Sequence, residues 1–168
     1  LFESWEVPPG AAEWIFNVRK GITFSNGKTL DADDCIYSIQ LHRGETKSPA
    51  KALLKPIKEI KALNKNQVSI TLSEGNADFP VILGDYHIIV VPKDFTDWDH
   101  LVGTEAYALQ SVEYGVRLTY KRRDGDYWKP NRGNFDGIEI RNIQDVAART
   151  AALQSGEIDG CNRLDART

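Results

Sequence analysis

The most constraining feature of the sequence is residues 13–38, which carry the patterns of a strand, a tight turn and a helix in succession. Apolar and polar residues alternate at the start of the stretch, and Trp14, Phe16 and Val18 fall on one side. Such alternation of aromatic and β-branched residues is typical of a strand with one buried face. The Asn26-Gly27 pair then predicts a tight turn, because both residue types tolerate a positive φ.

A helix is predicted directly after this turn. Asp31 is placed to cap its N-terminus, and Asp34, three residues later, can complete a variant of the capping box. Acidic residues in the first turn also suit the helix dipole. Cys35, Ile36 and Ile39 give the helix a narrow apolar face, and Gly44 is the expected C-terminal stop.

The same stretch resembles the signature of the family 5 extracellular solute-binding proteins, the peptide- and nickel-type receptors of ABC importers. The family pattern is roughly W-x-F-x-L-R-x-G-x-x-F-x-[DN]-G-x-x-[LF]-x-A-x-D-V-x-[YF]-S. Val18 and Cys35 stand where the pattern has Leu and Val. The matching residues are Trp14, Phe16, Arg19, Gly21, Phe24, Asn26, Gly27, Leu30, Ala32, Asp34, Tyr37 and Ser38.

Three later motifs extend the resemblance over nearly the whole chain. Gly103–Tyr107 is similar to the family's G-T-G-P-[YF], although Glu105 and Ala106 replace Gly-Pro. We expect different dihedral angles in this turn, since Gly permits backbone angles that Glu tolerates poorly. Asp126-Tyr127-Trp128 is similar to N-x-x-Y-W, and Ala152–Asp159 to A-L-x-x-G-E-[IV]-D.

Other patterns predict further elements. The sequence indicates two hairpins, one from residues 57–63 and 67–72 and one from 107–112 and 116–121. The apolar run 87–91 predicts a strand covered on both sides. Three more helices are expected. One is capped by Ser48 and runs to Leu54, a short one is capped by Asn76 and runs to Leu83, and the third is capped by Asp145 and ended by Gly156.

Length and charge restrict the class of protein. A chain of 168 residues is long enough for one substantial core. The net charge of −3 argues against nucleic acid as the main partner. No apolar run approaches the roughly 18 residues that a membrane helix needs. The chain begins with Leu1 and shows no signal peptide, which fits a mature or excised piece and leaves the compartment open.

The resemblance implies a fold and its division. Family members are two-lobed clamps, and the motifs present here belong to the first lobe. We therefore expect an α+β (α/β) lobe like that of periplasmic binding proteins, with mixed sheets and short helices, and with the second lobe missing. Residues 1–96 would form its outer subdomain, and residues 97–168 part of the core subdomain that leads to the hinge.

The resemblance also implies a function. The protein would be the binding component of an ABC importer, in the periplasm or lipid-anchored at the cell surface. It would carry a small solute, expected to be an oligopeptide or dipeptide, to the permease subunits in the membrane. No catalysis, cofactor or metal is implied. Alternative cargoes are a nickel complex, an oligosaccharide, an opine or haem, and a sensor domain that reuses the fold is a further alternative.

Candidate ligand-binding residues lie in two loops. Gly84, Asp85, Tyr86 and His87 combine a flexible glycine, a carboxylate and two aromatic hydrogen-bonding side chains. By resemblance they sit where family members present side chains to the cleft, and Asp85 would pair with the α-ammonium of a peptide. The alternative is that Asp85 is only a turn residue and His87 a half-buried one.

The second candidate loop is Cys161-Asn162-Arg163. Arg163 has the planar fork that binds a carboxylate through two hydrogen bonds, although a solvated arginine is the plainer interpretation. A third loop, Ser48-Pro49-Ala50, replaces a Ser-Pro-Tyr of oligopeptide-type members, and Ala50 cannot make the contact of that tyrosine.

The other candidate metal and catalytic residues are better explained by structural roles. The acidic residues at 31, 33 and 34 are better explained by helix capping than by a hard-metal site. The three histidines show no zinc spacing, and Cys35 and Cys161 are expected to be free thiols. A hydrolase or metal enzyme is the remote alternative, separable by the surroundings of His87 and Cys35. Arg117 and Lys121–Arg123 form a basic stretch that is expected to be a solvated face, with contact to a membrane permease as the alternative.

Overall fold

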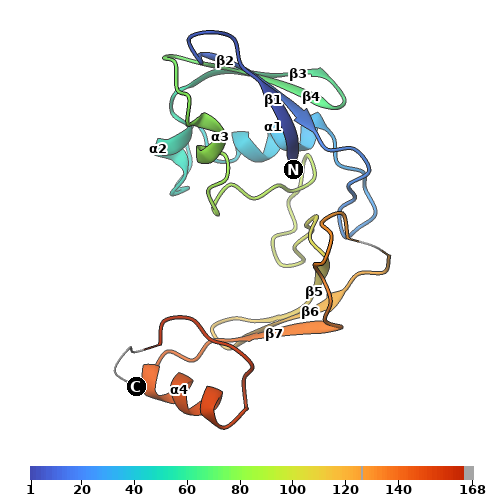
Figure 1. Cartoon of the computed structure of the whole chain (residues 1–168), viewed down its shortest axis with the longest axis vertical. Helices are drawn as coiled ribbons and strands as arrows, with labels where there is room; N and C mark the ends of the chain where they lie inside the picture. The colour runs from blue at the N-terminus through green and yellow to red at the C-terminus, as the bar shows by residue number, and fades with distance from the viewer. Residues whose placement is uncertain (126, 165–168) are drawn as a thin grey trace.

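The computed structural model describes residues 1–125 and 127–164; Asp126 of the third motif lies outside the described residues. The first sheet is antiparallel, with strand order β1-β2-β4-β3. The helices α1, α2 and α3 lie on one side of this sheet (Figure 1). The bounds are β1 Phe2–Glu6, β2 Glu13–Val18, β3 Ile57–Asn64, β4 Gln67–Leu72, α1 Ala32–Gln40, α2 Lys51–Leu54 and α3 Phe79–Ile82.

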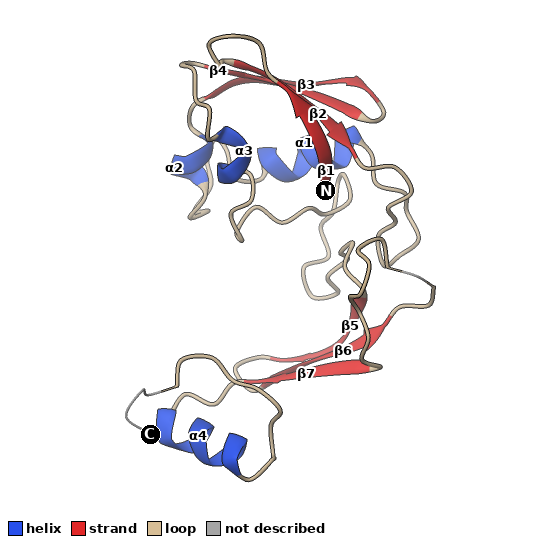
Figure 2. Ribbon diagram, in the orientation of Figure 1, coloured by secondary structure: helices blue, strands red, loops and turns tan. Residues whose placement is uncertain are grey.

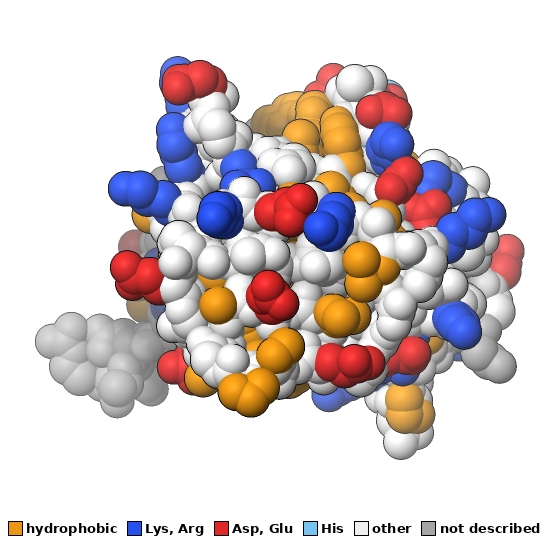
Figure 3. Space-filling model, turned by 90° about the horizontal axis from the view of Figure 1, so that it is seen from above, with side chains coloured by type: hydrophobic (Ala, Val, Ile, Leu, Met, Phe, Trp, Pro, Cys, Tyr) orange, Lys and Arg blue, Asp and Glu red, His pale blue; other side chains and the backbone are white. Residues whose placement is uncertain are grey.

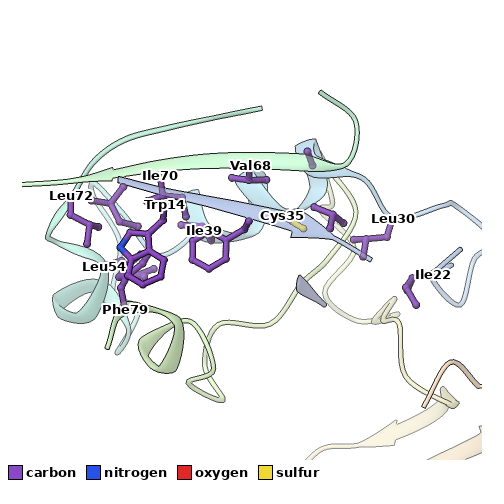
Figure 4. Packing of buried hydrophobic residues seen from close by; sticks show 14 of the residues in the cluster. Trp14, Ile22, Leu30, Cys35, Ile39, Leu54, Val68, Ile70, Leu72 and Phe79 are labelled. Carbon is purple, nitrogen blue, oxygen red and sulfur yellow. The ribbon is translucent and has the colours of Figure 1, made fainter. Parts of the chain in front are cut away.

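The core lies between this sheet and its helices. The alternation in β2 and β4 points every second side chain inward, and the cross-strand pairs Trp14–Ile70 and Phe16–Val68 stack the two rows. Residues from α1, α2 and α3 close the other side (Figure 4). Burying side chains of this kind stabilises the fold by roughly 1.5–3 kcal/mol each.

The predicted turn and helix of residues 13–38 are confirmed. Gly27 has φ 85° and donates its N–H to Phe24. Asp31 accepts the N–H of Asp34, and the Asp34 carboxylate accepts the N–H of Asp31, so both halves of the capping box form. The helix ends at Gln40, earlier than the predicted stop at Gly44.

A second antiparallel sheet, of order β5-β6-β7, lies apart from the first (Figure 2). Its elements are β5 Tyr107–Glu113, β6 Arg117–Arg122 and β7 Gly137–Arg141, followed by α4 Val146–Gln154. Asp145 caps α4 by accepting the N–H of Ala148. At the other end Gly156, with φ 76°, and Glu157 donate to Leu153 and Ala152, the Schellman pattern that ends a helix.

The predicted hairpins are confirmed, and three local predictions are wrong. Residues 87–91 form no strand, because Val91 hydrogen-bonds with the Ser38 side chain instead of a neighbouring strand. Helix α2 begins at Lys51, and Ser48 does not cap it but accepts the N–H of Ala50 in the preceding turn. Every described strand pair is antiparallel, so the sheets are not mixed.

The structure is α+β, as predicted. Its division near residue 96 stays a prediction. Seen from above, the outer face carries acidic and basic side chains interspersed with neutral ones (Figure 3). No helix among the described residues is long and apolar enough to cross a membrane.

Candidate functional site

The signature residues of α1 hold a distant loop rather than face an open pocket. Asp34 is fully buried, and its carboxylate accepts the backbone N–H of Lys93 at 2.7 Å and the Lys28 ammonium at 2.6 Å. The Ser38 hydroxyl accepts the N–H of Val91 at 3.0 Å, and the Tyr37 hydroxyl donates to the Phe95 carbonyl at 3.0 Å. These contacts fasten residues 91–95 along the helix.

The first candidate loop is closed by a local hydrogen-bonded turn. Asp85 Oδ1 accepts the backbone N–H of His87 at 2.9 Å and lies 2.8 Å from its Nδ1. These bonds lower the pKa of the Asp85 carboxyl below its usual value. The other oxygen, Oδ2, makes no hydrogen bond to any residue that the structure describes. The Tyr86 side chain, 82% exposed, has its ring centroid 3.9 Å from that of His87.

His42 lies in the same neighbourhood. Its Nδ1 is 2.6 Å from the Ser48 hydroxyl, and its Nε2 is buried without a described partner. Burial and the nearby His87 lower the pKa of His42, and the Asp85 charge opposes this shift.

The second candidate loop lines an open groove of about 1540 Å³ over the three-stranded sheet. The floor is apolar because cross-strand partners carry apolar side chains on the same face: Leu118 opposite Ile140, and Tyr120 opposite Ile138. Charged residues of both signs stand around it, namely Glu113, Arg117, Glu139, Arg141, Arg149, Glu157, Asp159 and Arg163.

Arg163 has an unusual backbone in this groove. Its φ of 55° lies in the left-handed region, which is uncommon for a residue other than glycine. The Arg149 guanidinium donates to the Arg163 carbonyl at 3.3 Å and to the Ile143 carbonyl at 2.6 Å. Asn162 and Cys161 line the same groove, whereas Gly84–His87 do not. The structure therefore does not bring the two candidate loops into one pocket.

A polar junction joins the two sheets, and sequence reasoning missed it. Arg123, expected on a solvated face, donates from its guanidinium to Thr23, Phe24 and Glu105. The Glu105 carboxylate accepts a hydrogen bond from the Tyr127 hydroxyl. Burial and this carboxylate raise the pKa of Tyr127. No local pattern could have revealed the contact, since Thr23 and Arg123 are 100 positions apart.

The surroundings of Cys35 and His87 bear on the remote alternative of a hydrolase or metal enzyme. Cys35 is buried, and this burial raises its pKa to about 12, so the thiol stays protonated. His87 pairs with Asp85 in a turn. Cys161 is also a free thiol. Among the residues described, no three His, Cys, Asp or Glu side chains converge as metal ligands.

Comparison with known proteins places this architecture in a wider group. The sequence profile of the bacterial extracellular solute-binding proteins, family 5 Middle, matches residues 1–168. Heme-binding protein A of Haemophilus influenzae is 26% identical over 95% of the chain, and the dipeptide-binding protein of Escherichia coli is 25% identical over 94%. The chain spans 34% of the length of each of these two relatives.

A solved structure shows the same fold. The binding protein AgaA of A. tumefaciens R10, in complex with agropinic acid, superposes with a TM-score of 0.85 and is 26% identical. The match covers 94% of this chain and 33% of AgaA. The chain thus has the fold of about one third of a periplasmic binding protein, as expected for a single-lobe fragment.

Proposed function

Because the chain belongs to the bacterial extracellular solute-binding proteins of family 5, we propose that it binds a peptide-like solute for an ABC importer. The binding takes place outside the inner membrane, in the periplasm or on a lipid-anchored protein. The loaded protein then delivers the solute to the permease subunits. The chain supplies one side of the binding cleft and performs no covalent chemistry.

The observation that carries the proposal is the groove over β5–β7. An apolar floor with charges of both signs at its edge matches an extended zwitterionic solute, which has apolar side chains and two charged ends. Arg163 is held with its carbonyl bound to Arg149, and its own guanidinium makes no hydrogen bond to a described residue. We propose that this guanidinium binds a carboxylate of the solute through two hydrogen bonds.

Asp85 is the proposed partner of the α-ammonium. Its Oδ1 is engaged by His87, whereas Oδ2 makes no hydrogen bond to a described residue, and the carboxyl, whose pKa is lowered by its bonds to His87, is charged at neutral pH as an ordinary aspartate is. Asp85 and Arg163 belong to the same chain and do not share one groove, so a solute that contacts both has to span the two candidate loops. A solute drives closure only by contacting the closed state better than the open one.

Calorimetry on the protein expressed from the complete reading frame tests this proposal. Short peptides with free termini should bind, and peptides blocked by acetylation or amidation should bind at least about tenfold more weakly. The variant Arg163→Gln should weaken binding by a similar factor, whereas Arg122→Gln, an exposed control outside the groove, should not. Absence of heat across the whole peptide panel would sink the peptide proposal.

An opine is a second candidate cargo. The similarity to the agropinic acid complex favours it, at 26% identity and a TM-score of 0.85. Agropinic acid in the same calorimetric panel separates the two candidates. Tighter binding of this compound than of any peptide would favour the opine.

A further inference from the structure

We propose that Arg123 is a positioning residue: its guanidinium fixes the angle between the two sheets, so that the groove keeps one place relative to the four-stranded sheet. The benefit of this role, a binding surface held in one arrangement, rests on the proposed function. The geometry itself stands on contacts within the described residues.

The guanidinium binds both sides of the junction at once. One terminal nitrogen, Nη1, donates to the Thr23 carbonyl at 3.0 Å and the Glu105 carbonyl at 3.2 Å. The other, Nη2, donates to the Thr23 hydroxyl at 3.0 Å and the Phe24 carbonyl at 2.9 Å. A planar fork whose acceptors lie on two separate segments permits only a narrow range of angles between them.

Both ends of this contact are anchored. The backbone N–H of Arg123 donates to the Ala106 carbonyl at 2.9 Å, directly after β6. On the other side, Phe24 is fully buried in the core of the four-stranded sheet. The side chain thus connects the end of β6 to a loop that the core holds in place.

The replacement of Gly-Pro in the second motif takes part in the junction. The Glu105 carbonyl accepts a hydrogen bond from the Arg123 guanidinium, and the Glu105 carboxylate accepts one from the Tyr127 hydroxyl. A glycine at this position would keep the carbonyl but lose the carboxylate. The turn therefore differs from the family pattern in a way that adds one side-chain contact at the junction.

One backbone amide reports the state of the junction. The N–H of Ser25 donates to the Gly103 carbonyl at 2.8 Å, across the same boundary. The neighbouring N–H of Gly27 donates to Phe24 within the turn and does not cross the boundary. Opening of the junction would therefore expose Ser25 and leave Gly27 protected.

Hydrogen exchange of three variants tests the role. In Arg123→Ala we expect the Ser25 amide to exchange at least about tenfold faster, a factor that corresponds to about 1.4 kcal/mol. Arg123→Lys should give an intermediate rate, because an ammonium lacks the fork. Arg122→Ala is the matched control, since its side chain is exposed and makes no hydrogen bond to a described residue. Amides of Gly27 and Ile70 should exchange at unchanged rates in all three.

A second readout measures the angle directly. Spin labels at Lys61 and Lys121, both exposed, should show a broader distance distribution in Arg123→Ala than in Arg122→Ala. Equal Ser25 exchange in the Arg123→Ala and Arg122→Ala proteins would overturn the proposal. So would a uniform acceleration that includes Ile70, since that indicates a general loss of stability. Neither measurement involves a solute, so their failure is separable from failure of the proposed function.

Discussion

The carboxylate of Asp34 is expected to contribute strongly to the free energy of unfolding. It has no exposed surface and accepts hydrogen bonds from two backbone N–H groups, of Asp31 at 3.0 Å and of Lys93 at 2.7 Å. It also contacts the Lys28 ammonium at 2.6 Å. Replacement by Ala would remove the acceptor of both N–H groups.

The expected cost follows from these partners. A hydrogen bond to a charged group is worth about 1.5–3 kcal/mol, and breaking a buried ion pair costs about 3–5 kcal/mol. Lys28 is 39% exposed and regains water when its partner is lost, which keeps the total at about 3–5 kcal/mol. For a chain of this length that corresponds to a fall in Tm of roughly 6–20 °C.

Urea unfolding of Asp34→Ala and Asp33→Asn measures the difference. Asp33 is the matched control, because it is adjacent, exposed and paired with Lys93 Nζ at 3.1 Å on the surface. A surface pair of this kind is worth about 0–1 kcal/mol. The reasoning would be refuted if the free energy of unfolding of the Asp34→Ala protein fell by less than about 1 kcal/mol, or by no more than that of the control. The buried aspartate would then not stabilise the fold as argued.

Two further predictions concern pH and backbone packing. Since the pKa of His42 lies below its usual 6.5, the unfolded chain takes up the proton more readily, so urea midpoints should fall as the pH drops below 6.5. His42→Gln should remove the part of this dependence that arises from His42. A Cβ on Gly75 would clash with the Gly10 carbonyl oxygen, so Gly75→Ala should destabilise by about 1–3 kcal/mol. Gly103→Ala, with no atom within 4 Å of its Cβ, should be neutral in the same melts.

Local patterns in the sequence predicted the elements whose hydrogen bonds close nearby. The hairpin of β3 and β4 and the capping box at Asp31 depend on partners a few residues away, and both formed as expected. The apolar run 87–91 failed as a strand because its partner, Ser38, is 53 positions away and bonds through a side chain. Periodicity carries no information about such a partner.

The same distinction between local and distant partners applies to the candidate site residues. Asp85 and His87 form the local turn that their spacing allows. Asp85 Oδ1 therefore acts as the plainer interpretation, a turn residue, predicted. The junction made by Arg123 depends on residues that the fold brings together, and the left-handed φ of Arg163 falls on a residue other than glycine, so the sequence does not signal it. A basic stretch without periodicity predicted only a solvated face, so the role of Arg123 could not be found from sequence.

The signature residues serve the fold, and we propose that other residues of the chain choose the cargo. Trp14, Phe16 and Phe24 fill the core, while Asp34 and Ser38 hold the 91–95 loop by hydrogen bonds. These residues of the signature therefore stabilise the fold. Relatives that share the fold carry names as different as heme-binding and dipeptide-binding protein. We propose that the choice of cargo lies in side chains outside the signature, such as those of the two candidate loops. Exchanging signature residues between two relatives should change the unfolding free energy, and exchanging the 161–163 loop should change the solute that binds.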